Sequence, residues 1–280
     1  MIRFAALTLA LLATSCAGPA AVGARVLKVR LWTGPAPVGD GTTEEVDREL
    51  EVHLPDARIA TGVAWVVCPG GGYIRHVMDR EGWPIAAWLN ENGIAALLLQ
   101  YRLPKGRPGV PLLDAQQAIR VARANARDWG VDPRRVGILG FSAGGHVASS
   151  AATRFTADAR PDFAVLVYPV VTMGEKTHAG SKKELLGADP SPDLVKAHSN
   201  ELHVTDRTPP AFVTHATDDA PVPPENSRAL VAAMRARGVP VEYLEFPTGG
   251  HGFNGCKGPI WEEWKAKSLA WLRGRGILPP

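Results

Sequence analysis

Short apolar runs alternate with amphipathic segments along most of the chain. From residue 63 onward the apolar runs lie at residues 63–67, 94–99, 136–139, 163–167, 211–214 and 241–246. Segments with helical spacing separate them. Strands that are apolar on both faces are typical of buried parallel sheets, in which helices connect one strand to the next. The pattern therefore predicts an α/β protein with a mostly parallel central sheet flanked by helices.

The segments before and between these runs add detail. Residues 26–32 and 49–54 alternate apolar and polar positions, which predicts two antiparallel edge strands. Apolar residues recur at helical spacing over residues 112–129, and Gly130 is expected to end that helix. A similar stripe covers residues 261–272 and is expected to end at Gly274.

One connection is much longer than the others. About forty residues rich in Pro, Lys, Asp and His separate the run ending at residue 167 from the run beginning at residue 211. They contain only short helical pieces, at residues 182–186 and 192–197. Connections of this length inside a compact domain are usually functional. We therefore expect a lid-like insertion at about residues 170–208.

Composition and charge limit the classes of function. The chain has 280 residues, 45% hydrophobic and 21% charged, with no repeat or low-complexity tract. We expect residues 25–280 to form a single domain. The net charge of +3 is small, and the basic residues are scattered along the sequence. Nucleic acid is therefore not an expected partner.

The N-terminus has the pattern of an export signal. Residues 1–3 carry a positive charge and about ten apolar residues follow, too few to span a bilayer. We expect residues 1–15 to be a signal peptide and residues 16–24 a short linker. Residues 13–16 resemble a bacterial lipobox, although Ala13 stands where Leu is usual, so lipid on Cys16 could anchor the protein to a membrane. Ordinary cleavage nearby is the alternative. Either way we expect an exported protein: periplasmic, an outer-membrane lipoprotein, or secreted.

The cysteines and histidines give little support for a metal site. The chain has neither a CxxC nor an HExxH pattern, and we expect no metal and no cofactor. With Cys16 lipidated, Cys68 and Cys256 could pair in an oxidising compartment. The position of Cys68 at the end of an apolar strand favours the other interpretation, a buried free thiol.

Residues 140–144 read Gly-Phe-Ser-Ala-Gly and lie between a predicted strand and a predicted helix. In this GxSxG context the glycines permit a sharp turn and close packing of helix on strand, so that the hydroxyl of Ser142 is exposed at the turn. Such a serine is suited to attack a carbonyl carbon. The sequence therefore indicates Ser142 as a candidate nucleophile.

A serine nucleophile needs a base and a carboxylate to orient that base. His251 follows the run at residues 241–246 and has glycines on both sides, which lets its loop direct the imidazole toward the sheet edge. Asp218 and Asp219 both follow the run at residues 211–214. Adjacent side chains point in different directions, so only one can orient His251, and the other is expected to cap a turn or the helix beginning near Pro224.

The negative charge formed by attack on a carbonyl needs backbone N–H donors. Residues 69–73 read Pro-Gly-Gly-Gly-Tyr directly after the first central strand, where such donors are expected. Glycine lets this backbone approach a substrate closely. We predict an oxyanion hole made by the N–H groups of Gly71, Gly72 and Ala143.

These motifs together resemble those of the α/β-hydrolases, and more narrowly the bacterial acetylxylan esterases and carboxylesterases adjacent to the hormone-sensitive-lipase family. The resemblance covers about residues 63–272. It rests on the segments 69–73, 101–103, 132–136, 140–146, 168–169, 208–210 and 249–253.

Some positions depart from the family pattern. Relatives of hormone-sensitive lipase carry His at the position of Pro69 and usually Asp at that of Phe141. In these esterases the acid lies four residues after the His of an HGxxD motif. Counting from His215 gives Asp219, although Ala216 replaces the glycine. The resemblance thus favours Asp219 over Asp218 and implies the triad Ser142, Asp219 and His251.

The expected function is a serine esterase that hydrolyses small acyl esters, with acetyl groups on xylan or related oligosaccharides as plausible substrates. A small ester or an acetylated carbohydrate would then be its partner. Two alternatives remain at this stage. One is a serine peptidase of the prolyl-oligopeptidase type, although the chain has no room for the usual propeller domain. The other is a non-catalytic binding module on a hydrolase scaffold.

Overall fold

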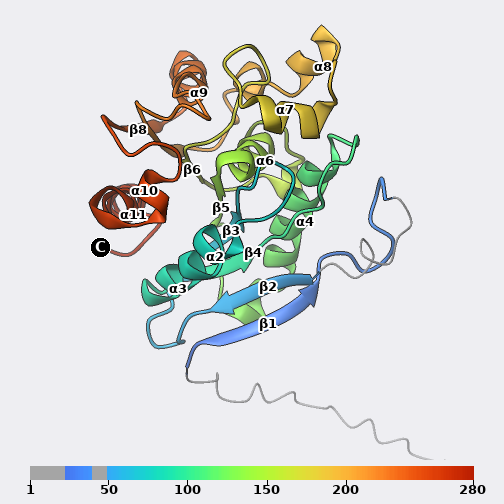
Figure 1. Ribbon diagram of the computed structural model, residues 1–280. Helices are drawn as coiled ribbons and strands as arrows, with labels where there is room; N and C mark the ends of the chain where they lie inside the picture. The colour runs from blue at the N-terminus through green and yellow to red at the C-terminus, as the bar shows by residue number, and fades with distance from the viewer. Residues whose placement is uncertain (1–22, 40–48) are drawn as a thin grey trace, which may run out of the picture.

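A computed structural model describes residues 23–39 and 49–280, and in these ranges eight strands form one sheet in the order β1-β2-β4-β3-β5-β6-β7-β8 (Figure 1). The antiparallel end comprises β1 (Arg25–Arg30) and β2 (Glu49–Leu54), and β2 pairs antiparallel with β4 (Ala95–Leu98). The other pairs are parallel, as predicted. They comprise β4 with β3 (Ala64–Cys68), β5 (Val136–Phe141), β6 (Ala164–Val167), β7 (Ala211–Ala216) and β8 (Val241–Phe246).

The two antiparallel strands were both expected at the edge of the sheet, and this holds only for β1. Strand β2 lies one position in, between β1 and β4. Its alternating pattern has a different cause from edge exposure. Leu50, Val52 and Leu54 are buried against one helical layer, while the side chains between them are less covered.

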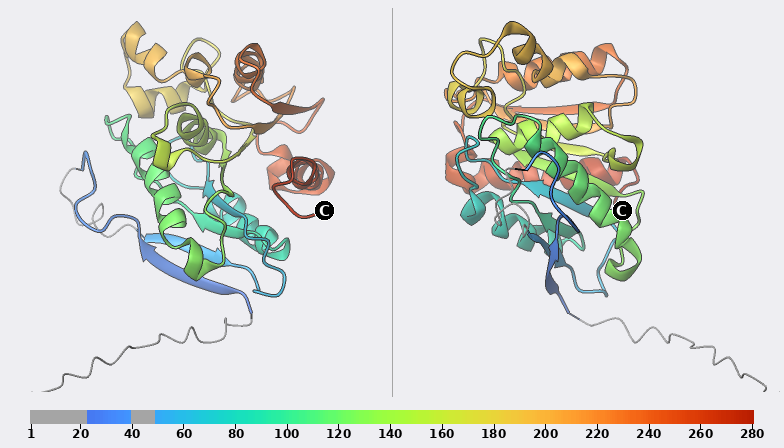
Figure 2. Two further views of the ribbon diagram at one scale, coloured as in Figure 1. Left: turned by 180° about the vertical axis from the view of Figure 1, so that it is seen from behind. Right: turned by 90° about the vertical axis from the view of Figure 1, so that its right-hand side faces the viewer.

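Helices cover both faces of the sheet, which gives three layers (Figure 2). The layer on one face comprises α4 (Val110–Ala124), α6 (Ser142–Thr153) and α9 (Glu225–Ala236), and the other comprises α3 (Trp83–Glu91) and α11 (Gly258–Gly274). The strands supply both faces by alternation. In β3, Val66 packs with the first layer, whereas Trp65 and Val67 pack with the second. The architecture is that of an α/β-hydrolase.

One helix interruption and one helix end test the sequence interpretation. The helix expected over residues 112–129 is split at Asn125 into α4 and α5 (Ala126–Trp129). The carbonyl of Val121 accepts both the side-chain amide of Asn125 at 2.8 Å and its backbone N–H at 3.1 Å. Gly130 ends α5 in the left-handed conformation (φ 67°), as predicted.

A buried ion pair holds the chain after β4 to the first helical layer. Arg102 and Asp114 have side chains 1% and 0% exposed, and Nη2 of the arginine lies 2.9 Å from Oδ1 of the carboxylate. The indole N–H of Trp32 donates to the same oxygen at 3.0 Å. A charged pair this deep requires such full hydrogen bonding, because removal of either partner would leave an unpaired buried charge.

The insertion predicted at residues 170–208 contains α7 (Ala179–Leu186), α8 (Pro192–Ala197) and the 3-10 turn η2 (Asn200–His203). Two buried asparagines fasten it to the body of the protein. The Asn226 side chain on α9 accepts the N–H of Val171 at 2.9 Å and donates to the carbonyl of Lys176 at 2.8 Å. The Asn200 amide donates to the carbonyl of His146 on α6 at 3.0 Å. The insertion is thus a packed part of the fold.

Two further expectations concern the thiols and the membrane. Cys68 and Cys256 are both free, and Cys68 is fully buried, as its strand position indicated. Cys16 lies outside the described residues. Within the described ranges, no helix has both the length and the hydropathy needed to cross a membrane.

Candidate active site

The GxSxG segment forms a sharp turn between β5 and α6. Strand β5 is buried along its length, and the chain reverses at Ser142, the first residue of α6, which has φ 51°. A residue other than glycine is uncommon at this φ, and the surrounding packing must hold the backbone in this conformation. The turn leaves Ser142 just 7% exposed, with its hydroxyl at the carboxyl edge of the sheet.

The glycines of this turn are required by close backbone contacts. A methyl group on Gly144 would overlap the carbonyl oxygens of Cys68 and Pro69, which belong to the neighbouring strand and loop and cannot rotate away. We expect Gly144→Ala to lower the free energy of unfolding by about 2–4 kcal/mol. Urea unfolding measures this change. Gly274→Ala is the matched control, because a methyl group there meets nothing within 4 Å.

Ser142, His251 and Asp219 are joined by hydrogen bonds. Nε2 of His251 lies 2.9 Å from the hydroxyl oxygen of Ser142, and Nδ1 lies 2.8 Å from Oδ2 of Asp219. The three side chains come from the ends of β5, β7 and β8. Since the carboxyl ends of parallel strands meet at one edge, residues 109 positions apart in sequence are brought within hydrogen-bond distance.

Asp219 is buried and receives several donors. Its side chain is 0% exposed, Oδ1 accepts the N–H of Val222 at 2.9 Å, and Oδ2 also lies 3.2 Å from Nε2 of His215. Burial alone would raise the pKa of this carboxyl group, but the hydrogen bonds from His215 and His251 outweigh it and hold the pKa at about 2. The carboxylate therefore stays ionised at any pH at which such an enzyme works.

Asp218 has a separate position. Its two carboxylate oxygens accept the backbone N–H groups of Gly249 and Gly250, at 3.2 and 2.8 Å. It thus caps the turn that carries His251, one of the roles expected for the aspartate that does not contact the imidazole. Both glycines have positive φ, 131° and 56°, so the turn needs glycine at these positions.

The glycine-rich segment after β3 lies beside Ser142. A β-carbon on Gly70 would lie 2.9 Å from that of Ser142. Gly71 and Gly72 follow with φ 129° and 66°, and their N–H groups have no hydrogen-bond partner in the described part of the chain. Ala143 is in the first turn of α6, where N–H groups lack helical partners. The three predicted donors thus lie on the two segments that meet at the serine.

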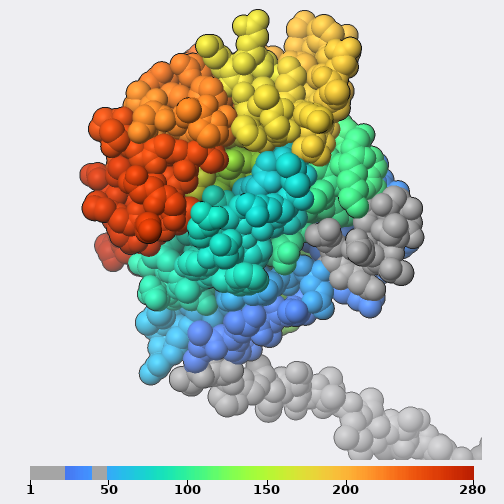
Figure 3. Space-filling model, viewed as in Figure 1, coloured from blue at the N-terminus to red at the C-terminus, as the bar shows by residue number. Residues whose placement is uncertain are grey.

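A pocket of about 410 Å³ opens at Ser142 and His251. Its walls come from residues 71–81, from the loop at residues 251–256, and from Pro221 and His178. His178 is the one contribution of the insertion to this lining. In Figure 3 the teal surface around residues 71–81 meets the yellow insertion and the red C-terminal segment. The rest of the insertion does not line this pocket.

Comparisons with known proteins agree with this geometry. Residues 50–234 match the family described as BD-FAE. The chain belongs to the BD-FAE family. An acetylxylan esterase from Xylanibacter ruminicola is 39% identical over 198 residues, which are 69% of this chain and 41% of that protein. Endo-1,4-beta-xylanase B from Butyrivibrio fibrisolvens is 36% identical, over 71% of this chain and 34% of its own.

Among solved structures, the acetyl ester-xyloside bifunctional hydrolase from Caldicellulosiruptor lactoaceticus is similar to this BD-FAE chain. It superposes with a TM-score of 0.82 at 36% identity, over 90% of this chain and 97% of that one. The chain spans less than half the length of the two curated relatives named above. The fold is shared with the solved structure over nearly its whole length, while the two curated relatives contain additional segments.

The BD-FAE chain also has a buried carboxyl group next to the site that sequence analysis did not identify. Glu81, at the end of α2 (Met78–Glu81), is 6% exposed. One oxygen accepts the N–H of Gly70 at 2.7 Å and the other accepts the hydroxyl of Tyr168 at 2.8 Å. Burial raises its pKa. The ring of Tyr168 in turn packs edge-on against His251 at 5.0 Å. Glu81 thus links the glycine-rich segment to the side chain that contacts His251.

His146 follows the turn on α6 and points away from the pocket, in agreement with a packing role. Its Nε2 donates to the carbonyl of His198 at 2.8 Å, and its Nδ1 accepts from the hydroxyl of Tyr73 at 2.7 Å. Burial lowers the pKa of His146 from 6.5 to about 3. The imidazole is therefore held neutral inside the fold, between His198 of the insertion and Tyr73 of the segment after β3.

This shift makes stability depend on pH. The unfolded chain binds a proton at His146 below about pH 6.5, whereas the folded chain does so only near pH 3, so the contribution is complete above pH 6.5 and is lost on acidification. We expect the free energy of unfolding to fall by up to about 1.4 kcal/mol per pH unit across this window. His146→Gln retains a donor and an acceptor but does not titrate. Equal slopes for the two proteins in urea unfolding at pH 7, 6 and 5 would contradict the assignment.

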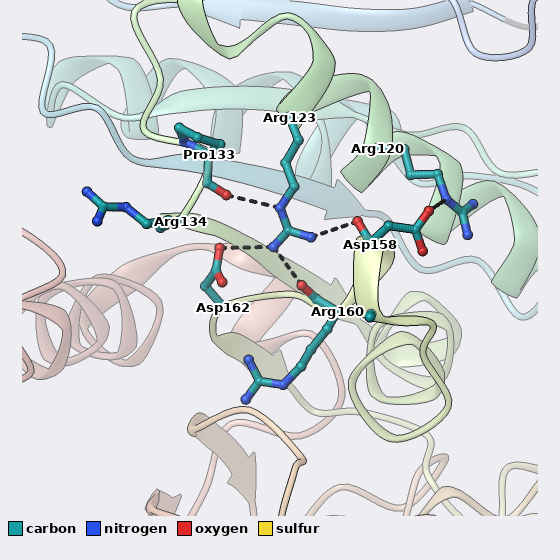
Figure 4. A pocket seen from close by; sticks show the side chains of 8 residues that line it. Arg120, Arg123, Pro133, Arg134, Asp158, Arg160 and Asp162 are labelled. Atoms are coloured by element: carbon teal, nitrogen blue, oxygen red, sulfur yellow. Dashed lines mark hydrogen bonds and ion pairs between the residues drawn. The ribbon is translucent and has the colours of Figure 1, made fainter.

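A larger hollow, of about 580 Å³, lies at the opposite edge of the sheet (Figure 4). Arginines dominate its lining, but they are engaged within the chain. Arg123 donates to three backbone carbonyl oxygens and to Asp162, and Arg120 pairs with Asp158 at 2.6 Å. The hollow contains no serine, cysteine or histidine. The bonds of these arginines connect the loops before β5 and β6. The hollow is distinct from the candidate active site.

Proposed function

We propose that this protein is a serine esterase that removes acetyl and similarly small acyl groups, with acetylated xylan or xylo-oligosaccharides as substrates. The observation that carries the proposal is the hydrogen-bonded series Asp219, His251 and Ser142 at the edge of an open pocket. Such a series activates a hydroxyl for attack on a carbonyl carbon.

In the first half of the reaction, the hydroxyl oxygen of Ser142 attacks the ester carbonyl while Nε2 of His251 takes its proton. The carbonyl oxygen becomes negative and accepts hydrogen bonds from the N–H groups of Gly71, Gly72 and Ala143. The intermediate collapses, and the alcohol leaves with the proton from His251. In the second half, water attacks the acyl-serine with the same proton transfers and releases the carboxylic acid.

Asp219 acts through the imidazole. By accepting from Nδ1 of His251, it keeps the other nitrogen free to receive the serine proton and stabilises the imidazolium that forms. The low pKa of Asp219 supports this role, since the carboxylate is charged throughout the cycle. Asp218 supports the loop and takes no part in proton transfer.

The substrate part of the proposal is supported by the relatives and by the pocket. One relative is named an acetylxylan esterase, and a solved neighbour is an acetyl ester-xyloside hydrolase. The lining includes the charged and polar side chains of Arg75, Arg80 and His178 beside glycine backbone and a few apolar side chains such as Ile74 and Val77. This surface is suited to a polar alcohol such as a sugar better than to a long alkyl chain.

A substrate panel tests the proposal. The purified protein is assayed with acetylated xylo-oligosaccharides, with aryl esters from acetate to octanoate, and with a prolyl peptide anilide. We expect acetate release from the oligosaccharides and falling kcat/KM as the acyl chain lengthens. Preference for octanoate would contradict the acyl part of the proposal. Cleavage of the anilide alone would favour the peptidase, and failure on all substrates the binding module.

We also propose that the protein is exported and anchored by lipid on Cys16. The positive and apolar start of the chain and the lipobox-like residues 13–16 support this. Growth of an expressing bacterium with labelled palmitate should label the wild type and not Cys16→Ala. Export of an unlabelled wild-type protein would favour ordinary cleavage and secretion.

A further inference from the structure

The insertion contributes one polar side chain to the pocket, His178, and this side chain has an unused donor. His178 is half buried, and it lines the same pocket as Ser142 and His251. Its Cε1 lies 3.9 Å from where a β-carbon on Gly72 would stand, so the imidazole lies over the segment that supplies the oxyanion donors. No partner for its Nε2 exists among the residues that the structure describes.

The proton on this imidazole is assigned by hydrogen bonding. His178 is the N-cap of α7, and its Nδ1 accepts the backbone N–H of Ser181 at 3.1 Å. The Ser181 hydroxyl lies 2.9 Å from the same nitrogen. Because Nδ1 is an acceptor, the proton of the neutral ring is on Nε2. Burial lowers the pKa of His178, and the nearby His251 adds to this effect, so the neutral ring is favoured.

The other polar groups of the pocket are differently placed. Ser142 and His251 bond to each other, and both oxygens of Glu81 are occupied. Arg75 and Arg80 are exposed at the rim. His178 is therefore a preorganised donor, held by the cap of a helix, that can bond to a part of the substrate other than the scissile ester. A sugar ester offers hydroxyl oxygens near the acyl group, whereas a simple aryl acetate offers none.

We propose that His178 is a specificity-determining residue, whose Nε2–H donates to a hydroxyl oxygen of the acylated sugar and so favours acetylated carbohydrate over simple esters. This inference rests on the proposed esterase function. It assigns the insertion a role in recognition of the alcohol part, and it predicts that the loss of this donor changes substrate preference more than the chemistry at the serine.

Two variants separate the donor from the helix cap. In His178→Asn, the side-chain oxygen can still cap α7, but no group reaches the position of Nε2. In His178→Gln, the amide nitrogen reaches approximately that position. We expect kcat/KM for acetylated xylo-oligosaccharides to fall about tenfold in His178→Asn and to be mostly retained in His178→Gln. For 4-nitrophenyl acetate we expect both variants to remain within about twofold of the wild type.

The outcomes distinguish this inference from the proposed function. An equal loss on both substrates in His178→Asn would overturn it and favour a donor to the oxyanion instead. Unchanged kcat/KM on both substrates would overturn it as well. In either case, a wild type that deacetylates the oligosaccharides keeps the proposed function. A wild type that hydrolyses only aryl esters removes the carbohydrate proposal and this inference together. Thermal melts of both variants check that α7 is retained.

Discussion

Replacement of Ser142 by alanine is expected to reduce kcat by a factor of about 10⁴ to 10⁶, while the protein remains folded. The hydroxyl is the only group at the turn that can form the acyl intermediate. Its loss leaves Nε2 of His251 without its hydrogen-bond donor but removes no packing atom from the core, since Ser142 lies at the pocket surface. The measurement is steady-state hydrolysis of 4-nitrophenyl acetate, together with a thermal melt.

A fluorophosphonate probe gives an independent readout of the same residue. We expect it to label the wild type at Ser142 and to leave Ser142→Ala unlabelled. Ser149→Ala is the matched control, because Ser149 is on the same helix but buried, with its hydroxyl bonded to the carbonyl of His146. It is expected to label like the wild type. A folded Ser142→Ala protein with wild-type turnover would refute the proposed mechanism.

The paired variants Asp219→Asn and Asp218→Asn are expected to differ by about two to four orders of magnitude in kcat. An amide at residue 219 presents its NH₂ or its oxygen to His251 without the charge, which favours the wrong imidazole tautomer and costs about 10³ to 10⁴-fold. An amide at residue 218 can still accept one N–H from the turn at Gly249 and Gly250, so its loss is expected to stay within about tenfold.

The side-by-side design controls for charge, since each variant removes one negative charge at adjacent positions. The measurement is kcat for one aryl acetate with both purified variants, with urea unfolding to verify folding. Equal losses would mean that the carboxylate of Asp219 has no special relation to the base. A larger loss in Asp218→Asn would reverse the assignment of the two residues.

Much of the fold could be predicted because its strands are short and almost wholly apolar. The runs at residues 136–139 and 211–214 correspond to β5 and β7, and their order along the chain placed the polar turns of Ser142 and Asp219 at the same sheet edge. Local pattern was enough there, since strands buried on both faces are recognised as short continuous apolar runs. The split at Asn125 was not predictable, because the apolar stripe continues at helical spacing across this residue.

Glu81 and His178 could not be identified in the same way. Glu81 is in the sequence Asp-Arg-Glu, which is typical of an exposed helix, and only the packing of α2 beneath the glycine segment buries it. His178 lies in a polar stretch with no periodicity. Its role depends on the cap it makes to α7 and on the path of the insertion over Gly72, both of which follow from three-dimensional packing rather than from spacing.

The fastening of the insertion by Asn226 and Asn200 has a consequence for how substrates reach the serine. Each amide is buried and bonded on both of its functional groups, so lifting the segment would break all of these hydrogen bonds. The entrance to the pocket is therefore open without a movement of the insertion. Under the proposed function, an acetylated polysaccharide would bind at a pocket whose walls are already in place, and selection would depend on its fit to that pocket.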